Sequence, residues 1–246
     1  MSGNAFVINR SVLHHTEEDA LLMSFFEFFG SKKVFVDVGG NLPSNAVSAP
    51  FLAEGWVGLL VEAIPQNAAQ FTDAGWPTVE AVALTSPEKA TAGTAIFHLA
   101  GGEAGPHSSL NREEIDPNSV SGRSIEVTLA TLEQLLDKYQ IDAIDLLSID
   151  TEGTELDILR GLDLSRHPVA LILVEDWQRD SSIHRHLVAN SYKIVLRTGF
   201  NSWYVPSSTP IKLPFWGQIK LLKKIYISSH LKRWRHQISV RLARAQ

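Results

Sequence analysis

The chain has 246 residues, a length that fits one α/β domain with an appended segment or two small domains. With 44% hydrophobic and 20% charged residues and a formal net charge of -5, it has the composition of an ordinary globular protein. The absence of cysteine excludes disulfides and thiolate metal sites, and the sequence shows neither a signal-peptide pattern nor an apolar run of the roughly 20 residues that span a bilayer. We therefore expect a cytoplasmic protein.

The first part of the chain alternates between predicted helices and strands. A helix is predicted from Thr16, which can cap it, to the residue before Gly30. Short β-branched runs predict buried strands at 33–38, 57–62 and 78–84, with helices at about 44–53 and 66–74 between them. This order is typical of a parallel sheet.

The second part interrupts this alternation and then resumes it. Strands predicted at 94–99 and 125–129 flank a glycine-rich loop, 101–109, and are interpreted as an excursion from the sheet. The alternation that follows ends in two strands that resemble an antiparallel edge hairpin. We expect an α/β, Rossmann-like fold with a seven-stranded, mostly parallel sheet. The remaining predicted elements are helices at 131–139, 155–161 and 182–190 and strands at 144–149, 169–174, 193–197 and 203–205.

The C-terminal segment differs in composition from the rest. The prolines from Pro206 to Pro214 predict a linker, so we expect a domain at 1–205 and a basic, amphipathic helical tail at 206–246. The tail contains nine of the 22 Lys and Arg residues, and no Asp or Glu occurs from Ser181 onward. Such a tail suits an anionic membrane surface, or packing against the acidic remainder of its own chain or of a homo-oligomer. Nucleic acid is a weaker third partner, because the rest of the chain is acidic.

A glycine turn and an acid follow the first two predicted strands. The turn Asp37-Val38-Gly39-Gly40-Asn41 presents backbone N–H groups to a ligand, and Glu62 is placed to accept the ribose hydroxyls of an adenosine. The diphosphate fingerprint G-x-G-x-x-G is absent, and Asp37 would repel a diphosphate but attract an amino group and a sulfonium. We therefore predict S-adenosylmethionine as the ligand, bound by Asp37, Gly39, Gly40, Asn41, Glu62 and Ala63.

A resemblance to the FkbM family of methyltransferases covers roughly residues 33–205. It is carried by VFVDVGGN, GLLVEAIPQN, TLEQLLDKYQIDAIDLLSIDTEGTELDILRG and ALILVED, of which LLSIDTEGTELDILRG is the most specific. Pro43 departs from the glycine that the family usually has there, which affects the local loop geometry. The resemblance implies a class I methyltransferase that O-methylates a sugar hydroxyl in a bacterial glycan, glycolipid or natural product. Within the family, the size and motifs are similar to those of enzymes that methylate O-2 of a nodulation-factor fucose.

Acidic residues follow the fourth and fifth predicted parallel strands. Ligands of open parallel sheets bind beyond the carboxyl ends of the strands, so the acids that follow these two strands are expected at the pocket: Asp150, Glu152, Glu155, Glu175 and Asp176. Converging carboxylates suit Mg²⁺ or another divalent cation. Similarity to macrolide-sugar O-methyltransferases implies Asp150, Glu175 and Asp176 as metal ligands. The alternative for Glu152 and Glu155 is that they only stabilise the start of a helix.

Two residues are candidates for the base that takes the proton of the acceptor hydroxyl. They are His107, in the glycine-rich loop, and Asp150. Glu152 and Trp177 are predicted to contact the sugar, Trp177 by stacking. Two rival interpretations are an RNA methyltransferase with a phosphate-binding tail and a non-catalytic scaffold that docks on a membrane. For a glycolipid substrate, the enzyme is expected at the inner face of the membrane.

Overall fold

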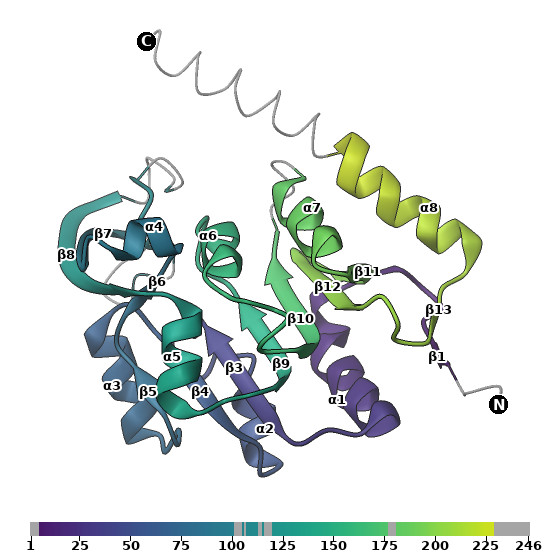
Figure 1. Ribbon diagram of the computed structural model, residues 1–246, viewed down its shortest axis with the longest axis horizontal. Helices are drawn as coiled ribbons and strands as arrows, with labels where there is room; N and C mark the ends of the chain where they lie inside the picture. Colours follow the sequence, from purple (N-terminus) through teal and green to yellow (C-terminus); the bar gives the residue numbers. More distant parts are fainter. Residues whose placement is uncertain are drawn as a thin grey trace, which may run out of the picture. The chain divides into compact units, whose positions relative to one another are not determined.

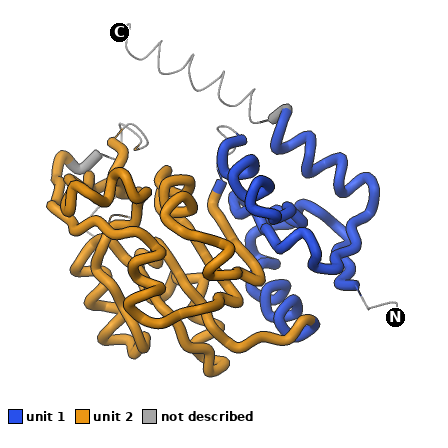
Figure 2. Tube along the Cα trace, in the orientation of Figure 1, with its two compact units in different colours: residues 1–28, 176–246 blue, residues 29–175 orange. Residues whose placement is uncertain are grey.

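The computed structural model describes residues 5–100, 105, 107–112, 115, 120–176 and 181–228. These residues form two compact units (Figure 2). The first unit contains the described residues of 1–28 and 176–246, and the second contains those of 29–175.

Five parallel strands form the main sheet of the second unit, in the order β10-β9-β3-β4-β5 (Figure 1). They are β10 (Val169–Glu175), β9 (Ile144–Ile149), β3 (Val34–Val38), β4 (Val57–Val61) and β5 (Val79–Glu80). Nearly all side chains of β3, β9 and β10 are buried, as expected for parallel strands covered on both faces. The α/β fold with a mostly parallel sheet is confirmed.

The carboxyl ends of the three central strands coincide. The register of β3 pairs Val38 with Val61 of β4 and with Ile149 of β9. The residues that follow these three strands therefore emerge at one edge of the sheet, where ligands of parallel sheets bind.

Five helices lie between β3 and β10 in chain order: α2 (Ala49–Ala53), α3 (Pro65–Asp73), α4 (Pro87–Ala90), α5 (Leu132–Tyr139) and α6 (Glu155–Arg160). The helix predicted at about 44–53 is shorter than expected, because it begins only at Ala49. Pro50 has no N–H to donate, and the first turn is the one place in a helix where that N–H is not needed, so the helix starts just before Pro50. The prediction of a helix from Thr131 is confirmed, with Thr131 and Gln134 forming a capping box.

The strand predicted at 78–84 is two strands in different sheets. β5 belongs to the main sheet, whereas β6 (Ala83–Leu84) pairs in parallel with β8 (Val120–Ala130). β8 also pairs antiparallel with β7 (Thr94–Ala100), which confirms an excursion outside the main sheet. A run of apolar residues alone does not reveal that the chain changes sheets within it.

The first unit begins with two short strands, β1 (Phe6–Val7) and β2 (Val12–Leu13), and the helix α1 (Glu18–Phe29). A single 3₁₀ turn, His15–Glu17, precedes α1, and the residue that caps this turn is His14 and not the expected Thr16. The His14 ring accepts from the Thr16 N–H, and the Glu17 carboxylate accepts from the His14 N–H. His14 can act as the cap because the Glu17 side chain bonds back to the His14 N–H, which gives the reciprocal pair of hydrogen bonds of a capping box.

The antiparallel pairing of the predicted hairpin is confirmed, between β11 (Tyr192–Thr198) and β12 (Asn201–Pro206). Its position at the edge is wrong, because the short strand β2 pairs in parallel with β11. β1 pairs with β13 (Ile211–Lys212), and α7 (Ser182–Ala189) precedes the hairpin. The two-residue strands β1, β2 and β13 were not predicted, because two residues are too few for a periodic pattern. The count of seven sheet strands stays a prediction.

The described part of the expected tail packs within the first unit. It contains α8 (Phe215–Lys223) and a π-helical segment, Lys224–Ser228. Gly217, Leu221 and Ile225 are buried. The domain boundary predicted at 205/206 stays a prediction, as does the helical continuation beyond 228, which lies outside the described residues.

Among the described residues, no helix combines the length and the hydropathy needed to cross a membrane.

Candidate functional site

A close backbone approach joins the ends of β3 and β9. Gly39 has φ +85°, and a Cβ built on it would lie 1.7 Å from the carbonyl oxygen of Asp150. The Asp150 N–H donates to Val38 O at 2.9 Å, and the Gly39 N–H donates to Val61 O at the same distance. Only glycine fits here, which explains the glycine of this turn.

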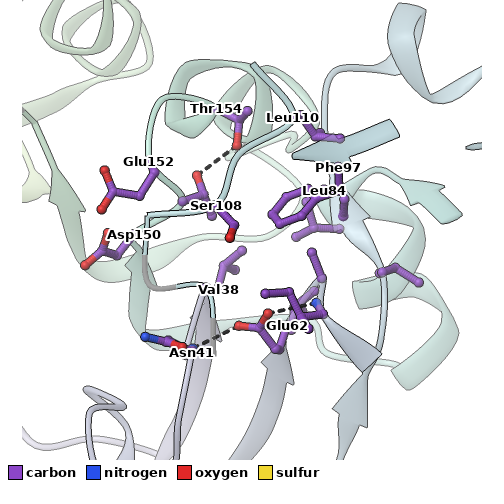
Figure 3. Close-up of a pocket in the computed structure, with 18 residues that line it drawn as sticks. Val38, Asn41, Glu62, Leu84, Phe97, Ser108, Leu110, Asp150, Glu152 and Thr154 are labelled. Carbon is purple, nitrogen blue, oxygen red and sulfur yellow. Dashed lines mark hydrogen bonds between the residues drawn. The ribbon is translucent and has the colours of Figure 1, made fainter. Parts of the chain in front are cut away.

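Glu62, the residue after β4, is buried and fixed in place by backbone donors. Its Oε1 accepts from the Ile64 N–H at 2.8 Å, and its Oε2 accepts from the Asn41 N–H at 2.9 Å (Figure 3). Asn41 has φ +55°, a conformation that asparagine adopts more readily than most residues. Each carboxylate oxygen retains a lone pair for a ligand. Burial raises the pKa of Glu62 to about 7, against the opposing effect of the two hydrogen bonds.

A pocket opens beside Glu62 at the edge of the sheet. Figure 3 shows Asp150 and Glu152 on one side of it and Leu84, Phe97 and Leu110 on the other. The pocket is therefore polar at one end and apolar at the other. Its lining residues are Val38, Gly39, Asn41, Val61, Glu62, Ala63, Ile64, Val82, Ala83, Leu84, Phe97, Gly105, Ser108, Leu110, Asp150, Thr151, Glu152 and Thr154.

Four of the six residues predicted to bind the cofactor line this pocket: Gly39, Asn41, Glu62 and Ala63. The other two, Asp37 and Gly40, occupy positions that support the loop. The buried carboxylate of Asp37 accepts from the Ser48 N–H at 2.9 Å, and burial raises its pKa. A Cβ on Gly40 would lie 2.8 Å from the ring of Phe71 in α3. Direct contact of Asp37 and Gly40 with a ligand stays a prediction.

Three acidic side chains lie together beside the polar end of the pocket, and two of them line it. We call them the acidic cluster: Asp150 and Glu152, which line the pocket, and Glu175. One carboxylate oxygen of each lies within 4.8 Å of the others. Burial, together with the charges of Asp150 and Glu152, raises the pKa of Glu175 to about 10. Carboxylate oxygens are the ligands that Mg²⁺ and Ca²⁺ prefer.

The remaining predicted metal ligand, Asp176, interacts with arginine in the first unit. Its Oδ2 lies 3.4 Å from Nη1 of Arg197, and its backbone carbonyl accepts from Nη2 at 2.9 Å. The structure instead brings Glu152, predicted as a sugar contact, together with Asp150 and Glu175. Metal binding by Asp176 stays a prediction, and Trp177 lies outside the described residues.

His107 contacts the acidic cluster through Glu152. Its Nδ1 lies 2.9 Å from Glu152 Oε1. The Ser109 hydroxyl donates to the Glu152 carbonyl at 2.9 Å, which ties the loop to this residue. Glu152 itself has φ +55°, a conformation that is uncommon for glutamate and that recurs among residues of functional sites. Ser109 was not predicted as a site residue, since nothing in the sequence near it signals a partner 43 residues away.

Glu155 stabilises the start of a helix, which was the alternative expected for it. Its Oε1 accepts from the N–H groups of Gly153 at 2.9 Å and Thr151 at 3.2 Å, just before α6 begins. A carboxylate in this position satisfies the free donors at the start of a helix.

The apolar end of the pocket was also missed. Leu84 lies in the short strand β6, Phe97 lies in β7, and Leu110 lies in the loop after β7. These residues meet because the excursion folds back over the edge of the sheet. The sequence of each segment by itself predicts only a buried strand. An aromatic ring and two leucines suit a flat, apolar ligand group such as a purine.

Comparison with known families identifies most of the second unit and part of the first. The model of the methyltransferase FkbM domain matches residues 37–192, which is more than half of the chain. The matched range starts in β3, at the turn beside the pocket, and contains every described residue of the acidic cluster. No curated protein matches the chain.

Proposed function

The chain belongs to the FkbM family of methyltransferases, and on this premise we propose that it transfers a methyl group from S-adenosylmethionine to a sugar hydroxyl. S-adenosylmethionine is the usual methyl donor of methyltransferases. The sugar acceptor rests on the family resemblance. A glycan or glycolipid at the inner face of a membrane is the proposed substrate class, and the link to nodulation-factor fucose remains a prediction within it.

The geometry of Glu62 is the observation that carries the cofactor assignment. Its two oxygens accept from the N–H groups of Ile64 and Asn41, which restrains the carboxylate at the wall of the pocket, and each oxygen keeps acceptor capacity for a ligand. A rigid carboxylate with two acceptor oxygens matches the two adjacent hydroxyls of a ribose. The apolar end of the pocket then takes the adenine, and the polar end takes the amino-acid part.

When bound, S-adenosylmethionine supplies an electrophilic methyl group on a positively charged sulfur. The side chains around it have to align the acceptor oxygen with that methyl group and exclude water. Asp150 and Glu152 line the polar end of the pocket. Their negative charge favours a cationic ligand over a diphosphate, in agreement with the absence of a diphosphate-binding fingerprint.

His107 is the proposed base. A hydrogen bond from Nδ1–H to Glu152 leaves the lone pair on Nε2, where it accepts the proton of the acceptor hydroxyl. The side chain of His107 is 57% exposed, so an acceptor that arrives from solvent reaches it. Asp150, the other candidate, lies among carboxylates, and Glu175 already hydrogen-bonds to it.

The acidic cluster fits a divalent cation, and a cation there is part of the proposal. Asp150, Glu152 and Glu175 offer three oxygen ligands within 4.8 Å of one another. A bound Mg²⁺ would lower the pKa of an acceptor hydroxyl and so reduce the demand on His107. Activity with and without a chelator tests this part separately from the cofactor assignment.

Isothermal titration calorimetry with S-adenosylmethionine tests the cofactor assignment. Glu62→Ala is expected to weaken binding by about 1.5–3 kcal/mol, because charge-assisted hydrogen bonds to the ribose are lost. Glu54→Ala, at an exposed glutamate outside the pocket lining, is the matched control and is expected to bind normally. Equal binding by both variants, or no binding by the unchanged protein, would refute the assignment.

A further inference from the structure

The helix α8 presents an apolar stripe to solvent. Phe215, Ile219, Leu222 and Tyr226 follow one another at intervals of four, three and four residues, which places them on one side of a helix. All four are between 38% and 69% exposed, and the neighbouring Trp216 is 72% exposed. We call these four residues the outer stripe.

A different face of the same helix holds it in place. Gly217, Leu221 and Ile225 are buried, and a side chain at Gly217 would come within 3.2 Å of the Ser11 hydroxyl. The ring of Tyr226, at the end of the outer stripe, packs edge-on against His184 with centroids 5.6 Å apart. The helix is therefore anchored by its buried face, and the exposure of the outer stripe follows from that packing.

The charged residues of the segment that carries the outer stripe have one sign. Lys220 and Lys223 are exposed on α8, and Lys212 is exposed on β13. No acidic residue occurs in the sequence from Ser181 to the end. Exposed Phe, Trp, Ile and Leu side chains beside lysines are the composition of helices that lie in a membrane interface.

We propose that α8 docks on an anionic membrane surface. The outer stripe and Trp216 enter the boundary between headgroups and acyl chains, and Lys220 and Lys223 meet anionic headgroups. This surface does not depend on which reaction the enzyme catalyses. It would bring the enzyme to an acceptor carried by a lipid.

The size of the stripe favours a membrane over a protein partner. Stable protein–protein interfaces involve roughly 20–30 residues a side, whereas the outer stripe has three residues on a helix of nine and one, Tyr226, in the π-helical segment that follows. A membrane needs no matching shape, so a narrow apolar stripe with positive charges beside it is sufficient.

Vesicle co-sedimentation of the full chain tests the proposal. The variant Phe215→Ser, Ile219→Ser, Leu222→Ser should bind vesicles of phosphatidylcholine with phosphatidylglycerol about tenfold or more weakly than the unchanged protein. The control Val57→Ser, Ile96→Ser, Val188→Ser also removes three exposed apolar side chains, but none from α8, and should bind like the unchanged protein. Vesicles of phosphatidylcholine alone should bind the unchanged protein about tenfold or more weakly.

Further measurements separate the alternatives. Lys220→Gln, Lys223→Gln should weaken binding to anionic vesicles and make it less sensitive to salt, and thermal melting shows whether each variant is folded. Equal vesicle binding by the serine variant, or no vesicle binding by the unchanged protein, overturns the proposal. A dimer that the serine substitutions dissociate, in a protein that binds no vesicles, would make α8 a protein contact. Since S-adenosylmethionine binding is measured separately, failure of one proposal leaves the other intact.

Discussion

In the first unit the carboxylate of Glu18 is surrounded by hydrogen-bond donors, whereas in the second unit that of Glu175 faces other carboxylates. The Thr198 hydroxyl and the Asn201 amide donate to the two oxygens of Glu18, the latter at 2.8 Å. Glu175 lies with Asp150 and Glu152. Both glutamates are less than 10% exposed, and burial raises the pKa of both.

The difference separates a structural role from a functional one. Around Glu18 the network continues to Trp203, whose indole N–H donates to the Thr198 hydroxyl at 2.8 Å, so hydrogen bonds link α1 to both strands of the hairpin. Such a network fixes a unique arrangement of α1 and the β11–β12 hairpin. Carboxylates that repel one another reduce stability, and they are found mainly where a ligand, a proton or a cation uses them. The neighbours of a buried acid therefore say more about its role than burial does.

The largest effect is expected at the base. His107→Gln should lower kcat by about 100- to 10,000-fold, because general-base catalysis contributes that much, while S-adenosylmethionine binding stays unchanged. Steady-state kinetics and calorimetry on the same preparation measure the two quantities. His98→Gln, at a histidine of β7 that does not line the pocket, is the control. If Asp150→Asn abolishes activity and His107→Gln does not, the base is Asp150.

In the first unit, the largest loss of stability is expected at Arg197. Its guanidinium is 2% exposed and donates to the carbonyls of Asp176 and Phe200 as well as to Ser202. Arg197→Met should lower the free energy of unfolding by about 3–5 kcal/mol, because Asp176 then loses its partner. Urea denaturation measures this loss. Arg185→Met, at an exposed arginine of α7, should change stability by no more than about 0.5 kcal/mol.

The same substitution at the two buried glutamates sharpens the comparison. Glu18→Gln should cost about 1–3 kcal/mol, because the new amide group points a donor at Thr198 or Asn201, which are donors already. Glu175→Gln should cost less than about 1 kcal/mol near neutral pH, since a carboxyl with a pKa of about 10 is protonated there and the amide replaces a neutral group. Equal losses in urea denaturation would mean that the two environments do not differ in this way.

The smallest expected effect is a pH dependence at Glu62. Its pKa is raised to about 7, so the fraction that is ionised increases as the pH rises through this value. The carboxylate accepts from ribose hydroxyls more strongly than the neutral acid, and S-adenosylmethionine affinity should rise up to about tenfold between about pH 6 and about pH 8. Glu62→Gln removes the titrating group and should flatten the profile. A profile that is unchanged in this variant would assign the dependence to another group.

The sequence determined most of the elements and the family. β-branched runs such as Ile144–Ile149 and the capping box at Thr131 depend only on neighbouring residues, so periodicity and local hydrogen bonding predict them. The sequence also predicted part of the pocket from a glycine after one strand and an acid after the next. Gly39 and Glu62 both follow parallel strands, and parallel strands end at a common edge of the sheet.

Tertiary structure decided which of these residues work together. Ser109 and Glu152 are 43 residues apart in the chain, and their hydrogen bond depends on the way the excursion folds back. The same holds for Phe97 in the apolar end of the pocket and for the buried face of α8. Contacts between segments that are far apart in sequence depend on the packing of the whole unit. No local pattern encodes them, and for this reason sequence alone could not distinguish the surroundings of Glu18 from those of Glu175.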